Sequence, residues 1–378
     1  MRIAIDARHL SDTYSGIAKY SENLLTHLSQ IDVENEYFVF IHDSFNRRLK
    51  VGENFLVIPS RIPPLSVRTL AAFGRHVTRT NCDFLHSLSP VAPLYGVERF
   101  ILTIHDLQPF SPHEEESARR PIQTRVASVF HRATFSHSAR AATWLVSVSQ
   151  ATKSRLSDLF PETEHKTIVV HSGVEQVFFS PPDGTVAQMV AKNLQLPARY
   201  VLYIGTARPN KNVPAMIHAF GRCRKEHADG LGDVQFLLVV GRDRFAGDCL
   251  RAIRSQGLQE CVRLVGPITE EEKRVLYARA QALFSVTRGE GFGFPIVEAQ
   301  ASGLPVLAGR DASVPEVTGE SAVLVDPGDE DAIATGLAEI LLDDPLRAEL
   351  RAAGLENVKR FSWDQAARKV LDIYDLLM

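Results

Sequence analysis

Residues 282–298 read ALFSVTRGEGFGFPIVE, which is typical of a strand, a glycine-containing turn and the start of a helix in direct succession. Pro295 suits the first turn of a helix, and the glycines allow the backbone to approach a ligand closely. A helix N-terminus after such a turn offers free amides and a positive dipole end to a phosphate. A plain tight turn between strand and helix is the alternative, and the turn alone does not decide between the two.

Two acidic residues, Glu290 and Glu298, flank this turn. Carboxylates beside an anion-binding turn repel the anion unless each accepts hydrogen bonds from a ligand that is rich in hydroxyl groups. A sugar or a ribose supplies such donors. The pair therefore favours a ligand that carries both phosphate and sugar over a purely structural turn.

Short runs rich in Val, Ile and Phe alternate with segments of helical period along the whole chain, which is typical of parallel strands buried on both faces. In the first half, the expected strands are residues 2–7, 36–42, 55–59, 83–87, 100–106 and 143–149. In the second half, they are residues 200–205, 234–241, 261–266, 282–286, 304–309 and 322–326. The pattern predicts an α/β protein with two doubly wound, Rossmann-like domains.

The segment SGVEQVFFSPPDGT, residues 172–185, is rich in turn-forming residues and marks the expected hinge. We expect an N-terminal domain over residues 1–178 and a second domain over residues 179–360. A final helix over residues 361–378 is expected to pack on one domain or to bridge back to the first. Because doubly wound sheets bind ligands at the carboxyl ends of their strands, we expect the two domains to face each other across a cleft.

The composition excludes several classes of protein. With 378 residues, 45% of them hydrophobic and 23% charged, the chain can form about two or three folded domains. A net charge of -3 gives no general attraction for nucleic acid, and no GxGxxG follows any strand, which disfavours a nicotinamide oxidoreductase. The four cysteines are widely spaced, which argues against zinc and disulfides and favours a reducing cytoplasm. The opening residues, MRIAIDARHL, predict a strand and neither a signal peptide nor a membrane span.

A second strand and turn, YIGTARPNKN at residues 203–212, contains the cations Arg208 and Lys211. Cations in such a turn can bind a diphosphate, although solvated loop cations are the common alternative. Arg242 and Arg244, after the strand that ends in VVG, are weaker candidates for the same role.

Three further candidates lie in the first half of the chain. His105 and Asp106 end the strand FILTIHD on the expected ligand side of the first domain. Gly16 opens a helix after the first strand, where a residue without a side chain lets the backbone approach a diphosphate or an acceptor. A structural histidine and an ordinary turn glycine are the alternatives.

Asp329-Glu330-Asp331 has the DxD form of a metal-binding motif, but it follows Pro327-Gly328 and begins a helical run. Acidic residues are favoured at helix N-termini, so we interpret this triplet as a helix cap. Without a carboxylate cluster elsewhere, we expect neither a metal nor another cofactor. Cations and helix-terminal amides are then expected to stabilise the leaving group.

Residues 288–298 resemble the E-x7-E motif of the family-4 retaining glycosyltransferases. The continuation EAQASGLPVLAGRDASVPEVTGESAVLVDPGD resembles the rest of that family's C-terminal signature. The resemblance is strong over residues 195–330 and weaker in the N-terminal half. It implies the GT-B fold of two Rossmann-like domains, a nucleotide diphosphate sugar as donor, and retention of configuration at the transferred sugar.

The resemblance also implies roles for individual residues. Glu290 would lie near the transferred sugar, Glu298 would hold the ribose hydroxyls, and Lys211 would neutralise the leaving diphosphate together with a nearby Arg. The family commonly has this Arg directly after the glycine, where this chain has Thr206, so Arg208 is expected to replace it. Contacts with the donor sugar or other parts of the substrates are expected for His105, Gly16, Asp106, Val265, Gly291, Phe292, Gly293 and Ser313.

The whole chain is most similar to the bacterial mannosyltransferases of exopolysaccharide and O-antigen synthesis. This similarity implies an alpha-mannosyltransferase with GDP-mannose as its donor. A UDP-sugar donor, a nonhydrolysing sugar-nucleotide epimerase and a noncatalytic nucleotide-sugar sensor are the alternatives.

Two basic stretches in the first half bear on the acceptor. Residues 62–80 and 117–142 interleave Arg with apolar residues and contain no acid, as helices at an anionic lipid surface do. An ordinary amphipathic surface helix is the alternative for either stretch. Together they favour a polyprenyl-diphosphate-linked oligosaccharide as acceptor, and a cytoplasmic protein at the inner face of the plasma membrane.

Overall fold

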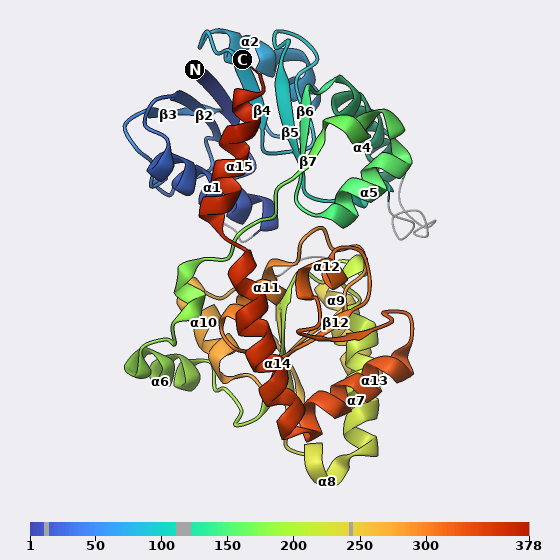
Figure 1. The fold of residues 1–378 in the computed structure, drawn as a ribbon. Helices are drawn as coiled ribbons and strands as arrows, with labels where there is room; N and C mark the ends of the chain where they lie inside the picture. The colour runs from blue at the N-terminus through green and yellow to red at the C-terminus, as the bar shows by residue number, and fades with distance from the viewer. Residues whose placement is uncertain (11–14, 111–121, 242–244, 378) are drawn as a thin grey trace. The chain divides into compact units, whose positions relative to one another are not determined.

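The computed structural model describes residues 1–10, 15–110, 122–241 and 245–377 (Figure 1). It divides into two compact units, one formed by Met1–Gly173 with Phe361–Met378 and the other by Val174–Arg360. Each unit is built on one sheet whose paired strands are all parallel. The predicted α/β class with two doubly wound domains is confirmed.

The first unit contains a seven-stranded sheet in the order β3-β2-β1-β4-β5-β6-β7. Its strands are β1 (Arg2–Asp6), β2 (Glu36–His42), β3 (Phe55–Ser60), β4 (Phe84–Ser87), β5 (Phe100–Ile104), β6 (Trp144–Ser147) and β7 (Thr167–Val169). Its helices and helical turns are α1 (Gly16–Ile31), η1 (Thr69–Phe73), α2 (Gly74–Thr78), η2 (Gln108–Phe110), α4 (Ile122–Ala141), α5 (Gln150–Leu159), η3 (Pro161–Lys166) and α15 (Trp363–Asp375). The sequence pattern predicts six of these strands and misses β7, because three residues at a sheet edge carry too short a signal.

Helix α15, the last helix of the chain, packs beside α1 in the first unit (Figure 1). The rings of Trp363 and Tyr20 of α1 form an edge-to-face pair at a centroid distance of 5.6 Å. The Tyr374 hydroxyl lies 2.7 Å from His86 Nδ1, and His86 Nε2 lies 2.9 Å from the Thr103 hydroxyl. Burial lowers the pKa of His86 to about 3, so this hydrogen-bonded chain between α15 and strands β4 and β5 is neutral at physiological pH.

The second unit contains a six-stranded sheet in the order β10-β9-β8-β11-β12-β13. Its strands are β8 (Tyr200–Gly205), β9 (Gln235–Val240), β10 (Val262–Val265), β11 (Ala282–Ser285), β12 (Val306–Gly309) and β13 (Val323–Val325). Its longer helices are α6 (Gly184–Asn193), α7 (Val213–Glu226), α9 (Ala246–Ser255), α10 (Glu270–Arg279), α11 (Phe294–Ala301), α13 (Glu330–Leu342) and α14 (Asp344–Asn357). Short helical segments are η4 (Gln176–Phe179), η5 (Pro209–Lys211), α8 (Ala228–Leu231), α12 (Val314–Thr318) and η6 (Val358–Arg360).

The core of the second unit fixes which strand ends meet. Helix α7 packs against α9 and α13, and apolar side chains of these helices join those of β8 and β9 in one buried cluster. Strands β8 and β11 are direct neighbours and run parallel, so the turns that follow them lie at the same edge of the sheet. This edge carries most of the predicted site residues.

None of the helices in the described parts of the chain combines the length and the apolar character that a membrane-crossing segment requires.

Candidate functional site

Two turns form the centre of the candidate site in the second unit. The first leads from β8 through η5 into α7, and the second leads from β11 into α11. The Arg288 amide donates to the Asn210 carbonyl at 2.7 Å and thereby joins the two turns. Because this bond is formed by backbone atoms, the geometry between the turns depends little on side-chain identity.

Lys211 and Glu290 meet across these turns. The Lys211 Nζ donates to Glu290 Oε2 at 2.5 Å, and the side chains are 21% and 17% exposed. A lysine ammonium has three donors, so Lys211 can keep this contact and still bind an anion. The structure thus brings together two of the predicted catalytic residues on a partly open surface.

The Glu290 turn is held by neighbouring segments. Gly289 and Gly293 adopt φ values of +71° and +89°, which L side chains rarely adopt. The Gly289 amide donates to Asp311 Oδ2 at 2.9 Å, and the Ser313 hydroxyl donates to the Glu290 carbonyl at 2.8 Å. Ser313, predicted to bind substrate, thus lies against the Glu290 backbone, and Asp311 is a supporting residue that the sequence did not indicate.

A third turn supports the first two from the end of β13. The Pro327 carbonyl accepts hydrogen bonds from the side-chain amide of Asn212 at 2.8 Å and from the Arg288 guanidinium at 2.9 Å. Asn212 adopts a left-handed conformation with φ of +56° directly before α7. Neither Asn212 nor Arg288 was among the predicted residues. The predicted Arg208 lies at the start of η5 with an exposed side chain.

Glu298 lies inside the unit, in contrast to the partly exposed Lys211–Glu290 pair. It has no exposed surface, and its two carboxylate oxygens accept from Tyr277 at 2.9 Å and from Lys273 at 3.3 Å. Among the other predicted contacts, Phe292 is buried against Phe294, Val265 ends β10, and Gly291 lies in the turn before α11.

His105 follows β5 at the carboxyl edge of the first unit's sheet. Its Nε2 lies 3.0 Å from the Leu88 carbonyl, and because a carbonyl only accepts, Nε2 carries the proton and Nδ1 presents a lone pair. Tyr20 packs against the ring edge-on at 4.7 Å. Burial lowers the pKa of His105 to about 4, so the imidazole is neutral near pH 7.

The end of β1, two strands away from β5 in the sheet, is fixed by a buried ion pair. Arg8 donates to both carboxylate oxygens of Asp6, at 2.8 and 2.7 Å, and its guanidinium lies 3.5 Å from the Phe73 ring centroid. The sequence did not reveal this pair, since two charged residues after a strand usually face solvent. Gly16 begins α1 as an exposed residue, and Asp106 accepts from the Gln108 amide at 3.1 Å.

The Asp329-Glu330-Asp331 triplet is a helix cap in the structure. Asp329 Oδ1 accepts from the amides of Asp331 and Ala332 at the start of α13, and Asp331 pairs with Arg222. Among the residues that the structure describes, no group of three or more His, Cys, Asp or Glu side chains is arranged to hold a metal. Arg242 and Arg244, the weaker alternatives for the diphosphate, lie outside the described residues.

The two basic stretches differ in the contacts that their arginines make. In residues 62–80, Arg68, Arg75 and Arg79 are exposed, and the nearby Tyr95 is 73% exposed. In residues 117–142, the structure describes the chain only from residue 122 onward. There, Arg132 donates to the Pro109 carbonyl and Arg140 donates to Glu162. Within the described residues, the arginines of the first stretch are exposed, whereas Arg132 and Arg140 of the second make the contacts named above, although Arg140 is 55% exposed at its side chain and Val129 is 68% exposed.

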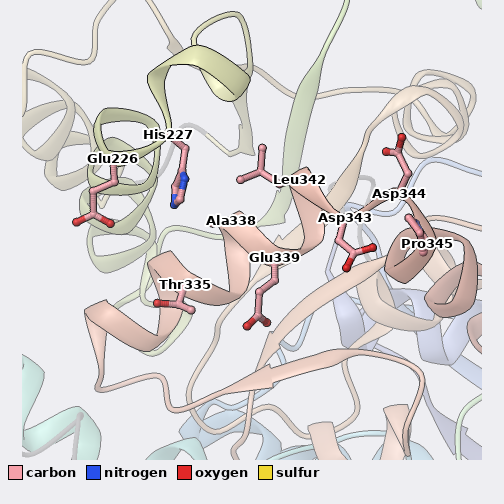
Figure 2. Close-up of a pocket in the computed structure, with 9 residues that line it drawn as sticks. All are labelled: Glu226, His227, Thr335, Ala338, Glu339, Leu342, Asp343, Asp344 and Pro345. Atoms are coloured by element: carbon pink, nitrogen blue, oxygen red, sulfur yellow. The ribbon is translucent and has the colours of Figure 1, made fainter.

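A separate hollow lies where α7 and α8 meet α13 and α14 (Figure 2). Its acids have local roles, because Asp343 caps α14 and Asp344 pairs with Arg347. None of the predicted site residues lines it. Its lining residues are Glu226, His227, Thr335, Ala338, Glu339, Leu342, Asp343, Asp344 and Pro345.

Comparison with solved structures identifies the architecture. The chain aligns with WaaG, a glycosyltransferase involved in lipopolysaccharide biosynthesis, at a TM-score of 0.76 and 14% identity, covering 98% of this chain and 99% of the other. It aligns with Anabaena HepE in complex with UDP and glucose at a TM-score of 0.77 and 17% identity, covering 99% of both chains. Two units of this kind form the GT-B fold.

Sequence comparison then gives the family. Residues 14–176 match the family described as Glycosyltransferase Family 4, and residues 187–357 match Glycosyl transferases group 1. The chain therefore belongs to the glycosyltransferases with a family 4 and a group 1 domain. It is 27% identical to the O-antigen chain mannosyltransferase B of Escherichia coli, over 75% of this chain and 72% of that protein. It is 24% identical to the O-antigen chain mannosyltransferase RfbU of Salmonella typhimurium, over 89% and 90%.

The lowered pKa of His105 predicts a loss of stability in mild acid. Between about pH 6.5 and 4, the unfolded chain binds a proton at His105 and the folded chain does not. The free energy of unfolding therefore decreases as the pH is lowered through this window. The contribution of His105 is about 3 kcal/mol across this window. This contribution is measured by denaturant unfolding of the wild type and of His105→Gln at several pH values.

The variant is expected to lose that part of the pH dependence, whereas His165→Gln, which replaces an exposed histidine of the same unit, keeps it. An unchanged pH dependence in His105→Gln contradicts the assignment of a partly buried, neutral His105.

Proposed function

We propose that this protein is a retaining alpha-mannosyltransferase that moves mannose from GDP-mannose to a lipid-linked oligosaccharide in bacterial exopolysaccharide or O-antigen synthesis. The observation that carries the proposal is the Lys211–Glu290 contact between the turns after β8 and β11. It joins the diphosphate-neutralising cation and the sugar-facing acid that the E-x7-E resemblance implies. The O-antigen mannosyltransferases among the relatives support mannose as the transferred sugar.

In this proposal, Lys211 acts on the leaving diphosphate. As the bond between the sugar C1 and the phosphate oxygen breaks, negative charge builds up on the diphosphate, and the Lys211 ammonium can donate to it while Glu290 keeps the ammonium in place. Arg208 at the start of η5 adds a second cation. The amides of Gly291 and Gly293, before α11, are further donors for the phosphates.

Retention of configuration fits attack from the face that the diphosphate leaves. The acceptor hydroxyl forms the new bond to C1, its proton passes to an oxygen of the leaving phosphate, and the diphosphate departs with the electron pair of the broken bond. Neutral His105 is suited to accept a hydrogen bond from a sugar hydroxyl through Nδ1. Glu298 is assigned to the ribose hydroxyls, and Val265, Gly16 and Asp106 to the remaining substrate contacts.

A UDP-sugar is the second candidate donor, because UDP-bound HepE shares the fold. The test is a transfer assay with a panel of GDP- and UDP-sugars and polyprenyl-diphosphate-linked acceptors, in the presence and absence of EDTA. We expect transfer from GDP-mannose with the anomeric configuration retained, and we expect it to continue in EDTA because Lys211 and helix-terminal amides supply the positive charge. Transfer that requires Mg²⁺ or Mn²⁺ contradicts the metal-independent mechanism, and conversion of the donor without an acceptor points to an epimerase.

The Lys211–Glu290 pair predicts the effect of removing either side chain. Lys211→Ala is expected to lower kcat by about 10²- to 10³-fold, the scale seen when one group that stabilises developing negative charge is removed. Glu290→Ala is expected to lower kcat comparably, because it loses both the sugar-facing acid and the support of Lys211. Lys192→Ala, which removes an exposed lysine of the same unit, serves as control. Near wild-type rates in both site variants contradict the proposal.

The exposed arginines of residues 62–80 support a location at the inner face of the plasma membrane, where lipid-linked acceptors lie. Binding to anionic liposomes is expected at low salt and is expected to weaken as salt rises, because screening reduces the attraction of Arg68, Arg75 and Arg79 for the lipid. Co-sedimentation measures it. Absence of binding at low salt contradicts this location.

A further inference from the structure

A buried cluster of charged and polar side chains joins α10 to α11. Lys273 and Tyr277 lie one turn apart on α10, and they donate to the two carboxylate oxygens of Glu298 on α11, at 3.3 and 2.9 Å. Lys273 is 2% exposed at its side chain, Tyr277 1%, and Glu298 has no exposed surface. The carboxylate of Glu298 is thus held at both oxygens by one neighbouring helix.

Packing alone does not require a cation in this cluster. Lys273 Nζ also lies 2.8 Å from Glu270 and 5.0 Å from the ring centroid of Phe178, so its charge is compensated at the cost of desolvation. Replacement of a buried ion pair by well-packed apolar residues is often neutral or stabilising. A lysine at this position is therefore better explained by what it does to Glu298 than by stability.

We propose that Lys273 is a positioning residue for ribose recognition. The neutral Tyr277 hydroxyl supports it by donating to the other carboxylate oxygen of Glu298. The inference rests on the proposed function, in which Glu298 accepts from the ribose hydroxyls of the donor. The Lys273 charge favours the ionised carboxylate in a buried position, and the two donors from α10 fix its orientation. A carboxylate oxygen can accept more than one hydrogen bond, so the contacts with Lys273 and Tyr277 are compatible with acceptance from a ribose hydroxyl.

The burial of Glu298 adds a condition to this role. Because the carboxylate has no exposed surface, a ribose hydroxyl reaches it only when the side chains that cover it shift on donor binding. Lys273 and Tyr277 approach from α10, and they hold the carboxylate in place during that shift. Without Lys273, the carboxyl group is expected to become protonated or to turn away, and in either form it is a poorer acceptor for the ribose.

The experiment compares nucleotides that differ only in the ribose hydroxyls. Dissociation constants of GDP and 2′,3′-dideoxy-GDP, and of UDP and 2′,3′-dideoxy-UDP, are measured by calorimetry with the full chain. Hydrogen bonds to an ionised carboxylate predict that the wild type binds the ribose form about 10- to 100-fold more tightly than the dideoxy form. Lys273→Met is expected to bind both forms with nearly equal affinity, and Tyr277→Phe is expected to lose part of the difference.

The ratio of the two constants separates positioning from a general structural effect. A purely structural role weakens both nucleotides and leaves the ratio unchanged, so an unchanged ratio in Lys273→Met overturns the inference. A larger ratio also overturns it, because Lys273 would then compete with the ribose. If Lys273→Met does not fold, the ratio in Tyr277→Phe decides.

A control variant and the wild type separate a failure of the role of Lys273 from a failure of the proposed function. Glu270→Gln removes the exposed partner of Lys273 and leaves the contact with Glu298, so its ratio is expected to equal that of the wild type. A wild type that binds the nucleotides without a ribose preference overturns the role of Lys273 and the assignment of Glu298 to the ribose, and leaves the transfer reaction itself uncontradicted. A wild type that binds neither GDP nor UDP contradicts the proposed function and this inference together.

Discussion

The ion pair between Lys211 and Glu290 depends on one constraint, the parallel pairing of β8 with β11. Parallel neighbours end at the same edge of a sheet, so their turns lie side by side whatever residues they contain. The Arg288 amide and the Pro327 carbonyl then fix the distance between the turns, and the left-handed glycines orient the Glu290 backbone. The Lys211–Glu290 contact of the second unit therefore follows from the position of the turns after β8 and β11.

The titratable groups of the two units differ in their exposure to solvent. In the first unit, burial keeps His86 and His105 neutral, and the buried Arg8–Asp6 pair compensates its own charges. In the second unit, the Lys211–Glu290 pair remains partly exposed, where a diphosphate can reach it. The first unit therefore offers a neutral hydrogen-bonding group at His105, and the second offers a partly exposed cation at Lys211.

The sequence predicted the fold closely, because buried parallel strands leave a clear apolar signal. The expected strands at residues 36–42 and 200–205 agree with β2 and β8 to the residue, and only the short β7 escaped. The glycine turns also indicated where Lys211 and Glu290 lie. The contacts of Asp311, Lys273 and Asn212 could not be predicted, because they depend on how separate helices and turns pack. Glu298 shows the same limit: its motif indicates a role, but only packing reveals that the carboxylate is buried against α10.

The central claim is that Lys211 binds the diphosphate of a nucleotide sugar at the turns after β8 and β11. A crystal structure of the protein with its tightest-binding nucleoside diphosphate tests this most directly. The account predicts the Lys211 Nζ within about 3 Å of a phosphate oxygen, with the phosphates against the turn before α11. A nucleotide bound elsewhere, with Lys211 paired to Glu290 alone, would contradict it.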